Sequence, residues 1–310
     1  MKLGIIGLGK MGGNLAVQAV KKGIHVVGKS RSPKPELEQK GVKIVDAYDS
    51  FVSELSAPRV IYLSLPAGTT VDNILEELVP FLEKNDVIMD GGNSFFLDSI
   101  RREKELWKKG IYFLDCGTSG GLEGARNGAC FMVGGRKEGV KFVEPLLKTL
   151  AVNDGFVYTG EPGSGHFVKL VHNGIEFGML QAIGEGVALM KGSEFNLDLA
   201  NIFKNWSHGS VIRGWLVELM EQGLRTQQFD DIASYIEDTG EVNWLVHDAI
   251  EKEIPIPVIA LSVMELFKSR EKDSDAYKAI ALIRHGFGGH PFGSDEYIQK
   301  ERKTSRITKI

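Results

Sequence analysis

Cysteine is scarce in this sequence. Only Cys116 and Cys130 occur among the 310 residues, and neither lies in a Cys-x-x-Cys pair or beside a cluster of histidines. A disulfide framework or a zinc site is therefore not expected, and reduced core thiols are the default interpretation. We predict no metal site.

Long apolar segments and an excess of charge are also absent. No run of 18 apolar residues occurs, and the N-terminal stretch MKLGIIGLGKMGGN is too short and too often interrupted by glycine for a signal peptide. The formal net charge of −4 gives no general attraction to nucleic acid or to an anionic membrane. We expect a cytoplasmic protein with neither as a partner, in which local groups bind any anionic ligand.

What is present is an ordinary globular composition. Hydrophobic residues make up 43% and charged residues 25% of the chain. A chain of 310 residues is long enough for two domains of about 150 residues each, and each can bury a sizeable core.

A glycine-rich turn near the N-terminus predicts a dinucleotide-binding fold. A short buried strand is expected at residues 2–6, then the sequence GLGKMG, a helix at 14–22 and a second strand at 25–27. In this arrangement the glycines permit a tight turn and allow a pyrophosphate to approach the N-terminus of the helix. The expected cofactor contacts in the turn are Gly7, Leu8, Gly9, Met11 and Gly12.

The end of the second strand carries no carboxylate. An Asp or Glu is usual there, about 20 residues after the glycines, to bind the hydroxyls of the adenosine ribose. Here the sequence continues with Ser30, Arg31 and Ser32. A guanidinium and two hydroxyls suit a 2′-phosphate, so we predict NADP in preference to NAD. The alternative is an exposed basic turn before Pro33.

Strands and helices continue to alternate through the first half of the chain. Apolar strand segments follow at residues 43–45, 60–66, 86–92 and 112–118, which predicts a doubly wound, mostly parallel sheet. Ligands of such sheets bind beyond the carboxyl ends of the strands, so the loops at 65–68, 91–94 and 117–121 should converge there. We expect cofactor contacts from Leu65, Pro66, Ala67 and Asn93, and hydrogen bonds from Asn93 and Ser119. Asn and Ser are also common turn residues whatever their function.

The stretch Gly163 to Gly192 is the main candidate for chemistry. At about 100° per residue, Lys169, His172, Asn173 and Glu176 fall within one arc of a helix. A solvated Lys and Glu pair is the alternative. Four glycines, which each cost helix stability, suggest instead that another backbone or a ligand approaches closely. They are Gly174, Gly178, Gly184 and Gly186.

The second half of the chain keeps the helical period. Apolar residues recur at helical spacing in the segments 196–206, 211–222, 241–253, 257–270 and 275–287. We predict an α/β Rossmann domain at residues 1–163, an all-α domain at 164–290 for substrate binding and dimerisation, and a C-terminal tail at 291–310.

Five segments resemble the decarboxylating 6-phosphogluconate dehydrogenase family. They are GLGKMG, DGGNS at 90–94, CGTSGGLEGARNG at 116–128, GHFVKLVHNGIEFGMLQ at 165–181 and RHGFGGH at 284–290. The resemblance spans essentially the whole chain, whose length is similar to the short form of that family. Related 3-hydroxyacid dehydrogenases share the Rossmann half but not the segment HFVKLVHNGIE.

The resemblance implies oxidative decarboxylation of 6-phosphogluconate to ribulose 5-phosphate and CO2, with reduction of NADP. Lys169 would be the general base and Glu176 the later general acid, beside Asn173. A basic amine must be neutral, so the pKa of Lys169 should fall from about 10.4 toward about 7 to 8. The implied substrate-binding residues are Asn93, Ser119, Gly120, Gly121, His172, Asn173, Arg284 and His290. Arg284 and His290 would act on the neighbouring subunit's site, which implies a homodimer.

Three positions depart from the family pattern at the expected phosphate end. They are Phe177, where Tyr is usual, and Asn243 and Leu266, where basic residues are usual. Lys268 and Arg270 could substitute. A related aldonate, such as 6-deoxy-6-sulfogluconate or gluconate, is therefore an alternative substrate. A non-catalytic NADP sensor and a non-decarboxylating 3-hydroxyacid dehydrogenase are the alternative functions.

Overall fold

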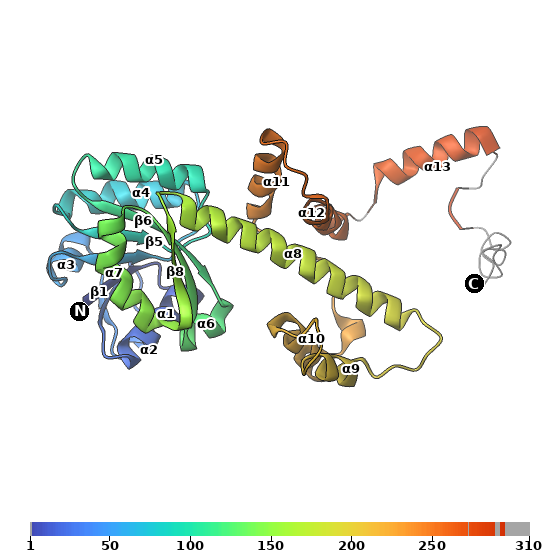
Figure 1. Cartoon of the computed structure of the whole chain (residues 1–310), viewed down its shortest axis with the longest axis horizontal. Coiled ribbons are helices and arrows are strands. Elements are labelled where there is room, and N and C mark those ends of the chain that lie inside the picture. The colour runs from blue at the N-terminus through green and yellow to red at the C-terminus, as the bar shows by residue number, and fades with distance from the viewer. Residues whose placement is uncertain (1, 272, 289–291, 295–310) are drawn as a thin grey trace. The chain divides into compact units, whose positions relative to one another are not determined.

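The computed structural model describes residues 2–271, 273–288 and 292–294 (Figure 1). The chain forms two compact units. The first comprises Met1–Phe229 and Asp238–Val263, and the second comprises Asp230–Glu237 and Met264–Ile310.

The first unit is built on one eight-stranded sheet in the order β3-β2-β1-β4-β5-β6-β7-β8. All neighbouring strands are parallel except β6 and β7, which are antiparallel. The order reverses between β1 and β4, which confirms the predicted doubly wound, mostly parallel sheet. The strands are β1 (Lys2–Ile6), β2 (His25–Lys29), β3 (Lys43–Val45), β4 (Val60–Leu63), β5 (Val87–Asp90), β6 (Tyr112–Ser119), β7 (Ala129–Gly134) and β8 (Ala151–Gly160).

Helices cover both faces of this sheet because successive strand residues point to opposite sides. On β4, Tyr62 joins a core that includes residues of α1 and α7, while Ile61 and Leu63 join a core that includes residues of α3, α4 and α5. Both faces are apolar, as a parallel sheet buried on two sides requires. The helices of this part are α1 (Lys10–Lys21), α2 (Pro35–Glu38), α3 (Tyr48–Ser53), α4 (Thr69–Leu78), η1 (Val79–Phe81), α5 (Phe96–Trp107), α6 (Gly121–Asn127) and α7 (Lys137–Leu150).

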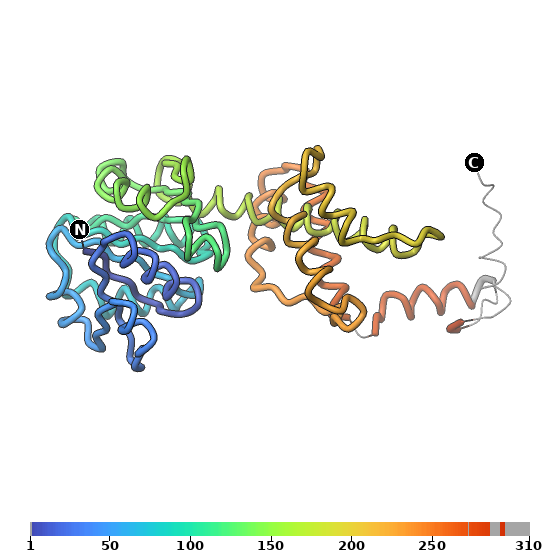
Figure 2. Tube along the Cα trace, turned by 90° about the horizontal axis from the view of Figure 1, so that it is seen from below, coloured from blue at the N-terminus to red at the C-terminus, as the bar shows by residue number. Residues whose placement is uncertain are grey.

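A 28-residue helix, α8 (Ser164–Lys191), leaves the sheet and carries the helical part of the first unit (Figures 1 and 2). Near the start of α8, Leu170 packs with Val242 and Leu245 of α11 (Glu241–Glu251) and Val263 of α12 (Pro257–Arg270). Near its end, a separate apolar cluster joins α8 to α9 (Leu199–Trp206) and α10 (Trp215–Thr226). An α/β Rossmann domain followed by an all-α domain is thereby confirmed.

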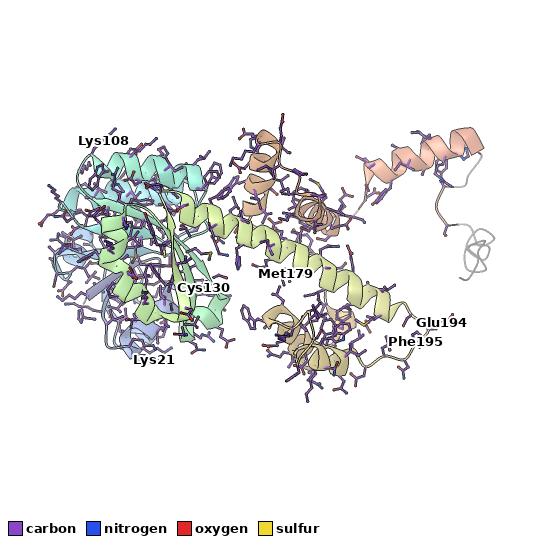
Figure 3. All side chains as sticks on the ribbon, in the orientation of Figure 1. Lys21, Lys108, Cys130, Met179, Glu194 and Phe195 are labelled. Carbon is purple, nitrogen blue, oxygen red and sulfur yellow. The ribbon has the colours of Figure 1, made fainter. Side chains whose placement is uncertain are left out.

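Several local predictions were wrong. The first helix begins at Lys10 rather than at residue 14, and the helix expected from 211 begins at Trp215. Strands β7 and β8 were not predicted at all. Cys116 is buried as expected, but Cys130 on β7 is exposed (Figure 3), so it is not a core thiol.

The glycines of α8 differ in their surroundings. A Cβ on Gly174 would lie 2.5 Å from a methyl group of Leu245, and one on Gly178 would lie 3.4 Å from Val258. A Cβ on Gly184 or Gly186 would meet no atom of the described chain within 4 Å. Close approach within the described chain explains Gly174, and for Gly184 and Gly186 the approach of another backbone or a ligand stays a prediction.

The second unit contains the end of α12 and α13 (Asp275–Gly288), and η2 (Phe229–Asp231) lies at its first boundary. Within it, the backbone N–H of Ile236 donates to Ser269 Oγ at 3.2 Å. Arg284 lies on α13 and is exposed, whereas His290 and most of the predicted tail lie outside the described residues.

Among the residues that the structure describes, no helix is both long and apolar enough to span a membrane. The last strand ends at Gly160 and α8 begins at Ser164, and the domain limits at 163 and 290 stay predictions.

Candidate active site

A cleft of about 360 Å³ lies at the carboxyl edge of the sheet, where the strand order reverses. It is bordered by the turn after β1 and by the ends of β4, β5 and β6. This is the position at which open α/β sheets bind their ligands. Its lining residues are Gly9, Lys10, Met11, Leu15, Tyr62, Ser64, Leu65, Gly91, Gly92, Asn93, Thr118 and Ala125.

The glycine turn leaves room for an anion at the N-terminus of α1. Gly7 has φ +96°, and a Cβ on Gly12 would lie 2.1 Å from the carbonyl oxygen of Gly7, so both positions require glycine. A Cβ on Gly9 would meet nothing within 4 Å in the described chain, and no side chain caps the helix that Gly9 begins. Free N–H groups and open space fit the pyrophosphate of a dinucleotide. The side chain of Leu8, in contrast, is buried in the core.

The basic turn after β2 contains an ion pair that the sequence did not predict. Ser30 Oγ donates to the carbonyl oxygen of Ser32 at 2.8 Å, and Arg31 lies 3.5 Å from Glu77 Oε2. The ammonium of Lys29 is buried 4.3 Å from the ring centroid of Tyr48. Arg31 is thus the exposed cation of this turn, and it has a carboxylate beside it.

The loop after β4 contributes less than predicted to the cleft. Leu65 lines it, whereas Pro66 and Ala67 follow in the same loop and are not among the lining residues. Tyr62 and Thr118, which were not predicted, do line it, and their hydroxyl oxygens are 2.8 Å apart. Strand periodicity could have shown that both side chains point to the same face.

A second, smaller cavity lies beside the cleft. Asn93 borders both, so the two spaces adjoin at this side chain. The smaller cavity is lined by Asn93, Ser94, His166, Lys169, Leu170, Asn173 and Glu241.

Lys169 is the buried cation of this smaller cavity, with 7% of its surface exposed. Its ammonium donates to Asn173 Oδ1 and lies 3.4 Å from His172 Nδ1. Burial lowers the pKa of Lys169 below its ordinary value, although Glu176, Glu241 and Cys130 oppose this shift. Desolvation disfavours the ammonium, and a neutral amine can accept a proton.

His172 links Lys169 to the carboxyl end of β6. Its Nε2 lies 3.1 Å from Ser119 Oγ, and its Nδ1 lies 3.9 Å from Glu176 Oε2. Lys169, His172, Asn173 and Glu176 thus form one polar stripe along α8. Gly120 and Gly121, at the start of α6, line neither cavity.

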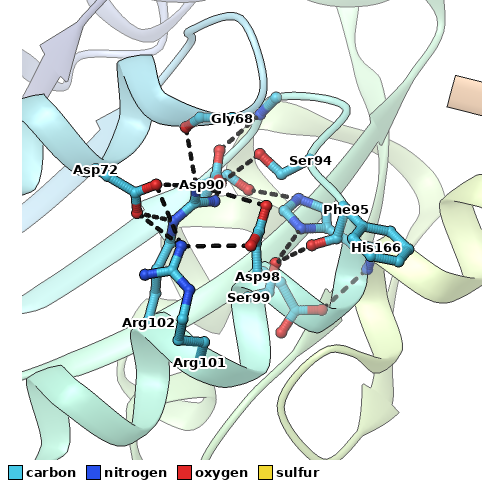
Figure 4. Close-up of polar contacts among 12 residues, drawn as sticks. Gly68, Asp72, Asp90, Ser94, Phe95, Asp98, Ser99, Arg101, Arg102 and His166 are labelled. Carbon is cyan, nitrogen blue, oxygen red and sulfur yellow. Dashed lines mark hydrogen bonds and ion pairs between the residues drawn. The ribbon is translucent and has the colours of Figure 1, made fainter. Parts of the chain in front are cut away.

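A buried polar network holds the loop that carries Asn93 (Figure 4). Asp90 Oδ2 accepts from Ser94 Oγ at 2.7 Å, and Asp90 Oδ1 accepts from the backbone N–H of Gly92 at 3.1 Å. The buried guanidinium of Arg102 lies 3.6 Å from the same carboxylate and donates to Asp72 at 2.8 Å. Each buried charge therefore has an opposite charge nearby.

His166 and Asp115 join α8 to this network. His166 Nδ1 lies 2.7 Å from Ser99 Oγ on α5, and its Nε2 lies 3.0 Å from the carbonyl oxygen of Asp90 (Figure 4). The carboxylate of Asp115 accepts from the backbone N–H groups of Gly163 and His166, at 2.8 and 2.9 Å. A carboxylate at a helix N-terminus is stabilising. Lys169, one turn later, is thereby fixed against the sheet.

Arg284 belongs to the second unit and His290 lies outside the described residues, so their predicted action on a neighbouring subunit's site stays a prediction. Conversely, the sequence interpretation missed Glu241, whose Oε1 accepts from Asn93 Nδ2 at 3.0 Å. A glycine followed by an acidic residue at the start of a predicted helix was the only local signal for Glu241.

Two family models together match nearly all of the chain. The NAD binding domain of 6-phosphogluconate dehydrogenase matches residues 2–160, and the 6-phosphogluconate dehydrogenase C-terminal domain matches residues 165–307. The chain belongs to the 6-phosphogluconate dehydrogenase family. Its members are NAD(P)-dependent oxidoreductases, and all residues that line the large cleft lie within the match to the NAD binding domain.

Individual relatives agree with this family. A Bacillus subtilis (strain 168) protein, YqeC, named only provisionally as a 6-phosphogluconate dehydrogenase, is 43% identical over 94% of this chain and 98% of its own. A 6-phosphogluconate dehydrogenase from Haloferax volcanii, named NAD(+)-dependent and decarboxylating, is 38% identical over the same shares. A solved 6-phosphogluconate dehydrogenase from Plasmodium falciparum has a TM-score of 0.81 and 28% identity, over 96% of this chain and 67% of that one.

Proposed function

We propose that this protein catalyses the oxidative decarboxylation of 6-phosphogluconate to ribulose 5-phosphate and CO2, with reduction of NADP. The observation that carries the proposal is the buried Lys169, held by Asn173 in a cavity that adjoins the dinucleotide cleft at Asn93. This cavity has a volume of only about 10 Å³, so a small polyhydroxy acid would bind where the cavity adjoins the cleft, between the amine base and the bound cofactor.

Lys169 is the proposed general base. As a neutral amine it takes the proton of the C3 hydroxyl, and the nicotinamide of the bound cofactor supplies the hydride acceptor for the C3 hydrogen. Burial of Lys169 supports this role because it favours the neutral amine. Asn173, hydrogen-bonded to the Lys169 ammonium, holds this side chain in place.

Glu176 is the proposed general acid. The 3-keto acid loses CO2 by cleavage of its C1–C2 bond, because its carboxylate lies β to the new carbonyl. The resulting enediol then takes a proton, which forms the C–H bond at C1 of the ketopentose. The carboxyl of Glu176 is half-exposed and lies two helical turns after Lys169, beside His172. It is therefore accessible to protons from solvent between turnovers.

A substrate panel tests the function directly. We expect the purified protein to reduce NADP with 6-phosphogluconate and to release one CO2 for each NADPH formed. A ratio of CO2 to NADPH near zero would instead identify a non-decarboxylating 3-hydroxyacid dehydrogenase. NADP binding without turnover of any aldonate would identify a sensor.

The same substrate panel tests which group the substrate carries at C6. Phe177 packs in an apolar cluster and cannot donate a hydrogen bond, Asn243 is uncharged, and Leu266 belongs to the second unit. We propose that Arg284 of a partner subunit binds the phosphate, together with His290. A tenfold or greater preference in kcat/KM, about 1.4 kcal/mol, for 6-deoxy-6-sulfogluconate or gluconate would replace the phosphate assignment but keep the chemistry.

Cofactor preference depends on the turn at the end of β2. We propose that Ser30, Arg31 and Ser32 bind the 2′-phosphate of NADP, as the P. falciparum structure's NADP+ complex and the absence of an acid on this turn suggest. The carboxylate of Glu77 opposes this preference because it pairs with Arg31. The H. volcanii relative is named NAD(+)-dependent, which is the opposite cofactor preference.

We expect Arg31→Ala to lower the NADP to NAD ratio of kcat/KM by about 10- to 100-fold, the range of a charge-assisted hydrogen bond. Glu77→Gln should raise the ratio by up to about fivefold, since the Arg31 pair is solvent-exposed and weak. Steady-state kinetics with both cofactors measure the ratio. Glu76→Gln, an exposed neighbour on α4, is the matched control. A ratio unchanged in Arg31→Ala would reject the assignment.

We also propose that the protein forms a homodimer and lies in the cytoplasm. The helical part of the first unit exposes large apolar side chains, among them Leu189, Phe195 and Val211 at 78%, 76% and 99%. Met179 and Phe195 project from this part in Figure 3. A homodimer would cover exposed apolar side chains of this size. Two free cysteines agree with a reducing compartment.

A further inference from the structure

We propose that Glu241 is a substrate-binding residue: its carboxylate releases Asn93 and accepts a hydrogen bond from a hydroxyl group of the polyhydroxy acid bound beside Lys169. This inference rests on the proposed function, because it assigns a residue to the same substrate. Glu241 is the first residue of α11, and the packing of α11 against α8 brings it to the smaller cavity.

The contacts of Glu241 suit such an exchange. Oε1 accepts from Asn93 Nδ2 at 3.0 Å, and Oε2 accepts from Thr239 Oγ1. Thr239 and Asn93 are both exposed, so neither hydrogen bond is enclosed by packing. Asn93 lies on the loop that borders the cofactor cleft, and a substrate reaching Lys169 from that cleft must pass it.

Packing holds the backbone that carries Glu241, whereas hydrogen bonds from two exposed residues hold its carboxylate. Gly240 has φ +82°, which glycine adopts readily, and it ends the loop before α11. Behind Glu241, Val242 and Leu245 are buried against α8, where Gly174 leaves the space for Leu245. The packing of α11 against α8 therefore fixes where the Glu241 side chain begins, beside the cavity that Lys169 also lines.

The charge of Glu241 determines which part of the substrate it can meet. A carboxylate accepts hydrogen bonds and donates none, so it binds hydroxyl groups and repels the anionic groups of an aldonate. The carboxylate of Glu241 would therefore orient the chain of hydroxyls so that the anionic ends of the aldonate lie away from it.

The charge also acts on Lys169. From α8, Glu176 and His172 face this amine, β7 supplies Cys130, α11 supplies Glu241, and the carboxylate of Asp115 on β6 lies at the start of the helix. Glu176, Glu241 and Cys130 hold the pKa of Lys169 higher than burial alone would. Removing the negative charge of Glu241 should thus lower the pKa of Lys169. The acid limb of the kcat/KM profile, where the amine becomes protonated, would move to lower pH.

Glu241→Gln tests both consequences in the full-length protein. We expect KM for 6-phosphogluconate to rise by about 10- to 100-fold, the loss of a hydrogen bond to a charged group, with kcat changed by less. The acid limb should shift to lower pH. Glu241→Asp keeps the charge but shortens the side chain, so KM should rise while the acid limb stays at its wild-type position.

Glu251→Gln is the matched control, since it makes the same change on the same helix, where Glu251 lies 3.7 Å from the exposed His247. NADPH affinity, measured by its fluorescence, reports that each variant is folded. Wild-type KM and an unmoved acid limb in Glu241→Gln would overturn the proposal. A wild-type enzyme without turnover of any aldonate would reject the proposed function, and the role of Glu241 with it.

Discussion

Lys169→Met should lower kcat by about 10²- to 10⁴-fold, the range for removal of a positioned general base. Met has a similar length and no titratable group, so it fills the buried site without accepting a proton. If Lys169 is the base, the acid limb of kcat/KM in the wild-type enzyme should report protonation of Lys169, whose pKa burial lowers. The variant should lose that limb, so its residual rate should not follow the ionisation of an amine. Stopped-flow measurement of NADPH formation across a pH series tests both effects.

Lys148→Met is the control for this substitution. Lys148 is exposed on α7 and pairs only weakly with Glu144 at 2.7 Å, because solvent screens such pairs. It should leave kcat and the pH profile at their wild-type values. Near-normal oxidation by Lys169→Met, with NADPH binding intact in both variants, would exclude Lys169 as the base.

The sheet of this protein was predictable because its signals are local. Each parallel strand near the centre is buried on both faces and so contains an almost continuous apolar run, such as Val60–Leu63 and Val87–Asp90. The glycine turn follows the first strand directly, and the order of strand, turn and helix defines the binding edge. The local sequence of these segments was enough to recognise the binding edge of the sheet.

Strands β7 and β8 were missed because their pattern differs. β8 contains Asn153, Asp154 and Gly155, residues that are rare in strands, and most of it is only partly buried. β7 forms an antiparallel pair with β6 and follows it after only a seven-residue helix. Both depend on pairing with the sheet, which the local sequence does not show.

The polar stripe along α8 and Glu241 illustrate the same difference within the candidate site. Lys169, His172, Asn173 and Glu176 are neighbours on a helix because three or four residues separate them. Glu241 reaches the cavity only because α11 packs against α8, a helix that ends 50 residues earlier in the chain. Similarly, the sequence did not indicate which glycines of α8 face a neighbour: within the described chain Gly174 does, and Gly184 does not.

Gly165→Ala should destabilise the protein by about 3 kcal/mol and lower kcat by about 100-fold. Gly165 lies in the first turn of α8, where the helix crosses the sheet. A Cβ there would lie 2.3 Å from the carbonyl oxygen of Asp115, and 2.6 Å from both Gly134 N and Met132 O. All three atoms belong to the backbone of β6 and β7, so no side chain can turn away to make room. The helix must move outward, and Lys169 moves with it.

Gly184→Ala on the same helix is the matched control. A Cβ there meets no atom of the described chain within 4 Å, so the substitution only replaces a poor helix former by the best one. It should stabilise the protein by up to about 1 kcal/mol and leave kcat unchanged. Urea unfolding gives both free energies, and single-turnover kinetics give the rate of hydride transfer. If Gly165→Ala unfolds at the wild-type urea midpoint with the wild-type rate, the contact of α8 with β6 and β7 does not position Lys169. If both variants lose the same stability, the loss comes from the helix and not from this contact.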